Sequence, residues 1–447
     1  MYLKNHFSRI GFILAAAGSA VGLGNIWKFP YVTGEYGGGA FVLVYLLAIL
    51  FIGLTVFLAE AVIGQNAQAD VATSFVKTSK SKNKNWKFAG FILFSGLIIL
   101  SFYSVVLGWI LSYVFTSFGT LPSDAKTAGA AFETLISKDI AAQIAYHTIV
   151  AGSVIFIVLK GIKEGIERIN LILMPLLGLI LLGLLIYSFT LDSFSTAVSF
   201  MFSPDWSKID GNALLAALGQ AFFTLSLGVG TIMTYSASLP KNVNFVKSSI
   251  MVAIVDTAIA ITAGLIIFSF LFEAGAQSSA GPGLVFISLP VIFSGWGFLG
   301  QVIAISFFVA LVFAGITSAV SMIEPSLKFF IDRFNFTRRK ATVICGSTFY
   351  LLGIVALLSM TSAYSESLTF FGKNAFDLMD FMTSSVMMPL AAILTCVFLG
   401  YFVDKELLQR IFTAHVSNLV FNIWYFLIKF IVPIAIITLF LNKLGIL

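Results

Sequence analysis

Polar residues with hard oxygen atoms stand beside glycine-rich interruptions in two strongly apolar stretches of the sequence. The first interruption is Gly18–Asn25 (GSAVGLGN), and the second is Phe222–Gly230 (FFTLSLGVG). Where a helix unwinds, its unpaired N–H groups can hold a carboxylate and its unpaired carbonyl groups can coordinate a cation. Neutral oxygens from Asn25, Thr224 and Ser226 suit a hard cation such as Na⁺. The two interruptions therefore predict binding of a cation together with an anionic or zwitterionic solute.

Other polar residues stand inside further apolar stretches. Thr317 and Ser318 follow the small residues of Ala314-Gly-Ile, which would let this backbone approach the first interruption. Taken alone, each hydroxyl would bond back to its own helix. Asp256 has apolar neighbours on both sides, and because a carboxylate at the bilayer centre costs about 3 kcal/mol or more, we favour an ion site over a structural role. Glu60 also lies inside an apolar stretch, and we expect its carboxylate to cap the free backbone amides of an unwound segment.

The chain that positions these residues is too apolar for a soluble protein. Of its 447 residues, 59% are AVILMFWYC and only 10% are charged, with 47 Phe and a mean hydropathy of +1.01. A single soluble core cannot bury such a surplus, so lipid is the expected solvent. This excludes a soluble enzyme, a nucleic-acid-binding protein and a disordered chain. Cys345 and Cys396 lie in apolar runs and indicate no disulfide framework.

Eleven stretches are long and apolar enough to cross a hydrocarbon core of about 30 Å, which needs about 20 residues per helix. These predicted spans are Ile10–Tyr36, Ala40–Gly64, Phe88–Phe118, Ala141–Val158, Ile166–Phe189, Gly211–Ser238, Ser248–Phe272, Gly297–Phe330, Ala341–Met360, Ala375–Val403 and Leu419–Leu441. The sequence thus predicts an all-α polytopic membrane protein.

The two interruptions fall in the first and sixth spans, so each begins a unit of five spans. Taken singly, each glycine run would more simply serve close helix packing. A unit with an odd number of spans must repeat upside down, however, and interrupted helices at matching positions of inverted repeats indicate a transport site near the midplane. We predict a transport core at residues 1–403, with repeats at about 9–190 and 211–403. Residues 404–447 form a peripheral eleventh helix and the C-terminus.

The basic residues predict the orientation of the chain. If the N-terminus is cytoplasmic, nineteen Lys and Arg residues lie on the inside and six on the outside. This asymmetry favours a cytoplasmic N-terminus, and eleven spans then place the C-terminus outside.

The segment Arg9–Phe41 strongly resembles the first helix of the neurotransmitter:sodium symporters. It carries GSAVGLGNIWKFPY at Gly18–Tyr31 and EYGGGAF at Glu35–Phe41. Gly219–Gly228 and Phe313–Ser318 resemble the sixth and eighth helices of the family, so the likeness extends over essentially the whole chain. The resemblance implies an inverted five-plus-five repeat with broken helices 1 and 6. Eleven spans look like a bacterial subgroup of amino-acid transporters, which implies the inner membrane of a bacterium.

The resemblance also implies two sodium sites and no chloride site. The first sodium ion would be held by the Ala20 carbonyl, Asn25, Thr224 and Asp256. The second would be held by the carbonyls of Gly18, Val21 and Ala314 and by Thr317 and Ser318. Chloride-dependent members have Asn at the position of Asp256 and Ser four residues later, where this chain has Ala260. A fixed carboxylate would therefore replace the chloride.

By the same resemblance, an amino-acid substrate would lie between the two interruptions. Its carboxylate would meet the amides of Leu23 and Gly24, the Tyr103 hydroxyl and the first sodium ion. Its amine would meet the carbonyls of Ala20, Phe223 and Thr224 and the Ser226 hydroxyl. Gly22 leaves room for the substrate's own carboxylate, whereas the monoamine transporters carry Asp there.

The expected pocket for the substrate side chain is lined by Ile99, Phe223, Val229, Ser318 and Met322. Four of these five residues are apolar, which favours a neutral hydrophobic side chain, and the adaptable Met322 would admit a large aliphatic or aromatic one.

The resemblance also implies gates on both sides of the pocket. Phe223 and Tyr103 resemble the outer lid, Lys28 and Asp380 the outer charged gate, and Asp332 one half of the inner gate. The family usually has Arg at the position of Lys28, so this chain lacks the paired hydrogen bonds that a guanidinium group can make to one carboxylate.

These features predict a sodium-coupled symporter that imports a neutral, hydrophobic or aromatic amino acid by alternating access. Its partners would be that amino acid and the lipid bilayer, and the oligomeric state stays open. The alternative is an ion channel or a membrane-embedded amino-acid receptor, which saturable sodium-dependent counterflow would separate from a symporter. An enzyme is not expected, because the sequence shows no nucleophile triad or His/Cys cluster, with His6, His147 and His415 standing apart.

Overall fold

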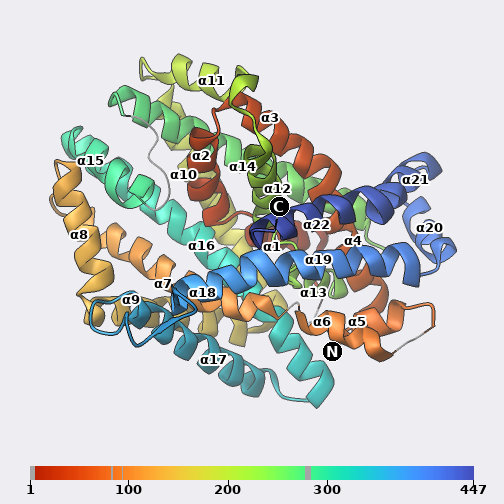
Figure 1. The fold of residues 1–447 in the computed structure, drawn as a ribbon. Helices are drawn as coiled ribbons and strands as arrows, with labels where there is room; N and C mark the ends of the chain where they lie inside the picture. Colours follow the sequence, from red (N-terminus) through yellow and green to blue (C-terminus); the bar gives the residue numbers. More distant parts are fainter. Residues whose placement is uncertain (1–5, 82–83, 93, 277–282, 447) are drawn as a thin grey trace.

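The structure is a computed structural model that describes residues 6–81, 84–92, 94–276 and 283–446. It is 81% helical, and its long helices cross one another in a single bundle around α1 (Arg9–Ala20) (Figure 1). In the described part of the chain, nine helices are long and apolar enough to cross a membrane, and α1 with α2 (Phe29–Glu35) forms a tenth, bent span. The all-α membrane class predicted from composition is therefore confirmed.

Spans two to five follow the bent first span. Their helices are α3 (Gly39–Ala48) with α4 (Leu54–Ala67), α7 (Ser95–Thr116), α9 (Ile140–Leu159) and α10 (Arg168–Ser188). Short π-helical turns join some of these pieces, at Gly24–Lys28, Ile49–Gly53 and Ile162–Glu167.

Spans six to eleven repeat this pattern and add one helix. They are α12 (Gly211–Thr224) with α13 (Thr231–Ala237), α14 (Phe245–Glu273), α16 (Gly297–Phe334), α17 (Arg338–Ser359), α18 (Ala375–Asp380) with α19 (Met388–Val397), and α21 (Asn418–Phe426) with α22 (Val432–Lys443). The sixth span consists of two short helices separated by residues 225–230, which is why neither half is long enough to count alone. In the part of the chain that the structure describes, these two helices occupy the predicted sixth span, Gly211–Ser238.

Short helices and one hairpin connect the spans, and the hydropathy pattern did not predict them. They are α5 (Val71–Thr78), α8 (Ala125–Ser137), α11 (Phe194–Phe202), α15 (Leu289–Ser294), α20 (Lys405–Thr413), and the antiparallel strands β1 (Thr369–Phe370) and β2 (Lys373–Asn374). Helix α6 (Lys87–Ile92) instead overlaps the start of the predicted third span, Phe88–Phe118. Further π-helical turns lie at Leu284–Ser288, Phe381–Met387, Phe398–Phe402 and Leu427–Ile431, and 3-10 turns at Lys84–Trp86 and Trp206–Lys208.

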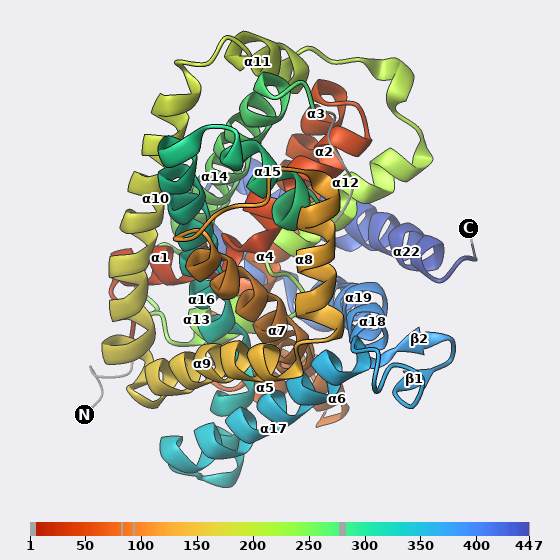
Figure 2. The same ribbon diagram turned by 90° about the vertical axis from the view of Figure 1, so that its left-hand side faces the viewer.

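Several of the connecting elements can be followed in Figure 2. Helices α11 and α15 lie at one end, while α5, α6 and the turn between α16 and α17 lie at the other. The start of α1 lies at the left of this view and the end of α22 at the right.

The outer faces of the peripheral helices are apolar. Leu179 on α10, Ile254 on α14 and Leu351 on α17 are 63%, 56% and 61% exposed. An apolar surface of this kind would promote aggregation in water but is compatible with the hydrocarbon core of a membrane.

A buried ion pair fixes the ends of three helices. Arg338 donates to both oxygens of Glu324 at 2.9 and 2.7 Å, and its Nε donates to the carbonyl of Val158. Because Glu324 is only 1% exposed, removing Arg338 would leave a buried carboxylate without its partner. The pair joins α9, α16 and α17.

Candidate functional site

The first span is broken at the glycine-rich segment noted in the sequence. Helix α1 ends at Ala20, and a π-helical turn begins at Gly24, with the two parts bent by 49°. The break leaves the last carbonyls of α1 and the first amides of the next turn without regular helical partners. It lies in the buried centre, where α1 packs against α10, α14 and α16.

The sixth span is broken more widely, over residues 225–230. Ser226, Gly228 and Gly230 all have positive φ, at 53°, 75° and 85°. Gly228 also approaches the start of α19 closely, because a Cβ atom there would lie 2.5 Å from the carbonyl oxygen of Met388. A residue with a side chain would therefore be both strained and crowded at this position.

Side chains hold the two breaks together. The Ser226 hydroxyl donates to the carbonyl of Ser19 at 2.8 Å, which links the second break to the first. The Glu60 carboxylate accepts from the amide of Gly228 at 2.8 Å and is fully buried. The prediction that Glu60 caps unwound backbone is therefore confirmed.

A first cluster of oxygen atoms surrounds Asp256. The Thr224 hydroxyl donates to the two carboxylate oxygens of Asp256 at 3.0 and 3.1 Å, and the Asn25 amide donates to one of them at 2.7 Å. The Asn25 carbonyl oxygen accepts from the amide of Gly22 at 3.0 Å. All three side chains are at most 1% exposed. Residues from spans one, six and seven thus meet at the first break, just beyond Ala20.

A second cluster surrounds the hydroxyl of Ser318. This oxygen lies 3.1 Å from the carbonyl oxygen of Gly18, 3.3 Å from that of Ser19 and 3.2 Å from that of Val21. One hydroxyl has one proton and cannot satisfy three carbonyl groups at once. The Ser19 carbonyl also accepts from Ser226, so the carbonyls of Gly18 and Val21 are the ones that compete for the Ser318 proton. Converging carbonyl oxygens of this kind suit a cation.

Thr317 completes this cluster in a different way. Its hydroxyl donates to the carbonyls of Ala314 and Phe313 at 2.9 and 3.1 Å, within its own helix. The sequence alone suggested that each hydroxyl would bond back to its own helix. This holds for Thr317 but is wrong for Ser318, whose hydroxyl reaches across to α1. Gly18 makes this approach possible, because a Cβ atom there would lie 3.1 Å from the Cβ of Thr317.

A small cavity of about 30 Å³ lies between the two breaks and α7, α16 and α19. Eleven of the twelve residues expected to bind substrate line it, and they are Ala20, Gly22, Leu23, Gly24, Ile99, Tyr103, Phe223, Ser226, Val229, Ser318 and Met322. The twelfth, Thr224, turns instead toward Asp256. Ligand pockets usually measure several hundred Å³, so the cavity is contracted in this conformation.

Two residues that sequence reasoning missed also line the cavity, Ser19 and Met388. Ser19 accepts hydrogen bonds from Ser226 and Ser321, and its position inside the glycine-rich run could have identified it. Met388 lies at the start of α19, far away in the sequence, where no motif pointed to it.

The space beside Gly22 is narrow and polar. A Cβ atom built there would lie 2.7 Å from the Ser318 hydroxyl oxygen and 3.2 Å from that of Tyr103. The Tyr103 hydroxyl is buried and has no hydrogen-bond partner among the described residues. Because buried hydroxyls nearly always have a partner, this group is available to a ligand at Gly22.

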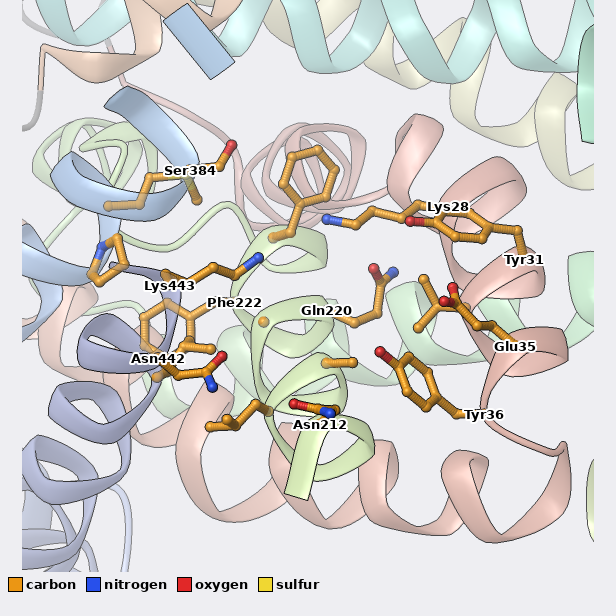
Figure 3. Close-up of a pocket in the computed structure, with 18 residues that line it drawn as sticks. Lys28, Tyr31, Glu35, Tyr36, Asn212, Gln220, Phe222, Ser384, Asn442 and Lys443 are labelled. Carbon is orange, nitrogen blue, oxygen red and sulfur yellow. The ribbon is translucent and has the colours of Figure 1, made fainter. Parts of the chain in front are cut away.

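A larger cavity of about 490 Å³ adjoins the small one and is shown in Figure 3. Phe223 and Met388 line both cavities, so the Phe223 ring stands between them. The ammonium group of Lys28 lies 4.4 Å from the centre of that ring. Figure 3 shows the ammonium groups of Lys28 and Lys443 turned toward the same part of the cavity, so the last span contributes a second cation that sequence reasoning missed.

The expected outer gate residues are not paired in this conformation. Ion pairs between described residues are limited to Lys80–Asp404, Lys328–Asp332 and Arg338–Glu324. Asp380 instead accepts from the Ser384 hydroxyl at 2.7 Å. The expected inner gate residue Asp332 pairs along its own helix with Lys328 at 3.0 Å.

Residues just before α1 pack against the far end of the sixth span and the start of the fifth. The Phe7 amide donates to the carbonyl of Ser238 at 3.1 Å, and the Phe7 ring packs edge-on against Tyr235. The Ser8 hydroxyl, which caps α1, donates to the buried carboxylate of Glu167 at 2.5 Å. Neither Ser8 nor Glu167 was singled out from the sequence.

Comparisons with known proteins agree with this geometry. The profile of the sodium:neurotransmitter symporter family matches residues 4–134 and 135–446. The uncharacterized sodium-dependent transporter YhdH of Bacillus subtilis is 37% identical over 448 residues, which cover 98% of this chain and 97% of that protein. An uncharacterized sodium-dependent transporter of Haemophilus influenzae is 34% identical over 457 residues, with the same two coverages.

The fold is also similar to a solved structure, that of MhsT in complex with L-phenylalanine. The two chains superpose with a TM-score of 0.88 at 42% sequence identity, covering 98% of this chain and 99% of MhsT. This match identifies the fold as that of the family's transporters, with broken first and sixth helices.

Proposed function

Because this chain belongs to the sodium:neurotransmitter symporter family and is a sodium-dependent transporter, we propose that it imports a neutral, hydrophobic or aromatic amino acid by alternating access. Its relatives are transporters rather than enzymes, and its own long apolar helices fit a multi-pass membrane protein. The observation that carries the proposal is the meeting of two oxygen clusters at the breaks of the first and sixth spans.

Two sodium ions are proposed to bind at these clusters. Asn25, Thr224 and Asp256, with the Ala20 carbonyl at the end of α1, supply one carboxylate and several neutral oxygens for the first ion. The carbonyls of Gly18, Val21 and Ala314 and the hydroxyls of Thr317 and Ser318 supply a neutral cradle for the second. Both sets consist of hard oxygen donors, which suit Na⁺ rather than a softer metal.

The substrate carboxylate is proposed to lie beside Gly22. The amides of Leu23 and Gly24 begin the helical turn after the break and so favour an anion. The unpartnered Tyr103 hydroxyl faces the same space. The first sodium ion would supply the remaining countercharge.

The substrate amine is proposed to meet the carbonyls of Ala20, Phe223 and Thr224 and the hydroxyl of Ser226. These groups lie at the ends of α1 and α12, where the helix dipoles favour positive charge. The Phe223 carbonyl already accepts from the amide of Ser226 at 3.1 Å, and its second lone pair remains for the amine. A zwitterion would thus satisfy the orphan groups of both breaks.

The substrate side chain would occupy the apolar part of the cavity. Ile99, Val229, Met322 and the additional Met388 line it, and none can pair with a charge. The solved complex of MhsT contains L-phenylalanine, which supports an aromatic or large aliphatic substrate here. Since the cavity is contracted, Phe223 and the methionines would move apart to admit it.

Alternating access would expose this cavity first to one side and then to the other. We assign Phe223 to the outer lid, Lys28 and Asp380 to an outer gate that pairs on closure, and Asp332 to the inner end. The transport core would comprise residues 1–403. The excess of basic residues at one set of loops supports a cytoplasmic N-terminus, an outer C-terminus and a location in the bacterial plasma membrane.

A thermal-shift screen tests the proposal directly on the purified chain. The twenty amino acids are added one at a time, with sodium or with potassium. We expect stabilisation by a few hydrophobic or aromatic amino acids only when sodium is present, because ligands that bind the folded state raise its apparent stability. Stabilisation that is equal in potassium would contradict sodium coupling.

A further inference from the structure

A cationic cavity of about 270 Å³ lies away from the transport site, where α5 and α6 meet the end of α16. Its lining includes the charged side chains of Lys84, Lys87 and Arg333, called the rim below, and the rings of Phe91 and Phe329. The two rings pack edge-on with their centres 5.2 Å apart. The site therefore combines three positive charges with an aromatic wall.

None of these three cations forms an ion pair with a described carboxylate. The carboxylates on the neighbouring elements are engaged elsewhere. Asp332 pairs with Lys328, and Asp70 is buried and accepts from the amide of Thr73 at the start of α5. The cavity thus keeps a net positive charge, which favours an anionic ligand.

An apolar groove of about 320 Å³ continues from this cavity along the outside of the bundle. Phe91 and Phe329 line both spaces, and the groove extends between α7, α16 and α17 to Cys345 and Thr348. On α17 the groove is lined from Ile344 to Thr348, which is about 6 Å of helix. Its far end, at Thr348, lies ten residues or about 15 Å beyond Arg338, the first residue of α17. That distance is about half the thickness of a hydrocarbon core of about 30 Å.

We propose that this combined site binds an anionic phospholipid of the cytoplasmic leaflet. The phosphate lies among Lys84, Lys87 and Arg333, and one acyl chain follows the groove past Phe91 and Phe329 toward Thr348. A soluble phosphate would use only the rim, whereas the adjoining groove fits the chain of a lipid. The choice of leaflet rests on the N-inside orientation proposed above, but the existence of the site does not rest on the transport function.

Native mass spectrometry of the detergent-purified chain tests this site. Phosphatidylglycerol is titrated against phosphatidylcholine with the same acyl chains. The variant Lys84→Gln/Lys87→Gln/Arg333→Gln removes the three positive charges of the rim. We expect it to weaken phosphatidylglycerol binding about a hundredfold, since basic residues near a membrane surface contribute roughly equal increments of affinity for anionic lipid.

A matched control removes the same charges elsewhere on the same side of the bundle. The variant Lys160→Gln/Arg339→Gln/Lys340→Gln also loses two lysines and one arginine, and none of the three lines either space. We expect it to bind phosphatidylglycerol as the wild type does. Thr348→Trp keeps the rim but fills the groove, and we expect at least a tenfold loss of lipid binding.

Several results would overturn the proposal. These are equal binding of the two lipids by the wild type, equal loss in the rim variant and its control, or undiminished lipid binding by Thr348→Trp. Displacement of the lipid by glycerol 1-phosphate at equal concentration would instead assign the rim to a soluble phosphate. If the rim variant does not fold, Thr348→Trp and the comparison of the two lipids still decide the question.

Discussion

Replacement of Gly22 by aspartate should convert the pocket from one that accepts a carboxylate to one that rejects it. A Cβ atom at this position lies 3.2 Å from the Tyr103 hydroxyl, the group proposed to donate to the substrate carboxylate. The new carboxylate would therefore come within about 5 Å of the substrate's own. At an effective dielectric of about 20, two such charges repel by about 3 kcal/mol, which corresponds to a loss of affinity of about two hundredfold.

The same position also carries a steric cost, which needs a control. The new Cβ lies 2.7 Å from the Ser318 hydroxyl oxygen, so any side chain displaces that group. Gly22→Asn has nearly the same shape as Gly22→Asp but no charge. The difference between the two variants isolates the electrostatic effect.

The assay is equilibrium binding of the radiolabelled amino acid chosen by the thermal-shift screen, with sodium present. We expect Gly22→Asp to bind it about two hundredfold more weakly than Gly22→Asn. The decarboxylated amine of the same compound should show the opposite preference, because the introduced carboxylate can pair with its ammonium group. Equal loss in both variants would show that the effect is steric, and wild-type binding by Gly22→Asp would place the pocket elsewhere.

Three further predictions concern ions and the inner end of the bundle. Asn25→Ala and Thr317→Ala should each raise the sodium concentration for half-maximal binding about tenfold, since each removes one oxygen ligand worth about 1.4 kcal/mol; unchanged sodium dependence in both would refute the two-site assignment. Uptake by the wild type should persist when chloride is exchanged for gluconate, whereas Asp256→Asn with Ala260→Ser should become chloride-stimulated; a collapse of wild-type uptake without chloride would refute the charge-balance argument. Ser8→Ala removes a hydrogen bond to a buried carboxylate, worth about 1.5–3 kcal/mol, and should increase labelling of a cysteine placed in the inner pathway; unchanged labelling would show that this bond does not hold the inner end closed.

The sequence predicted the architecture well because the relevant signals are local. Eleven apolar runs identify the spans, and glycine runs identify the breaks, since glycine permits close approach at both breaks and positive φ in the second. The Gly228 position illustrates both needs, with φ of 75° and the Met388 carbonyl close by. The connecting helices were not predicted, because they are short and hydropathy marks only apolar runs that are long enough to cross a membrane.

Contacts between distant elements could not be predicted from the residues alone. The sequence could not say that Ser318 reaches across to α1 while its neighbour Thr317 bonds to its own helix, because this depends on which face of α16 meets the break. The same holds for Lys443, which joins Lys28 at the outer cavity only through the packing of the last span. Ser8 and Glu167 carry no motif, and only the folded chain brings them together.

Uptake into proteoliposomes under an imposed sodium gradient tests the central claim most directly. The purified chain is reconstituted, and the amino acid that sodium-dependent binding identifies is followed with sodium outside or with potassium outside. We expect accumulation above the external concentration only with the inward sodium gradient, together with saturable counterflow of the labelled amino acid when the gradient is absent. Binding without accumulation, or a sodium conductance without counterflow, would contradict symport and favour a receptor or a channel.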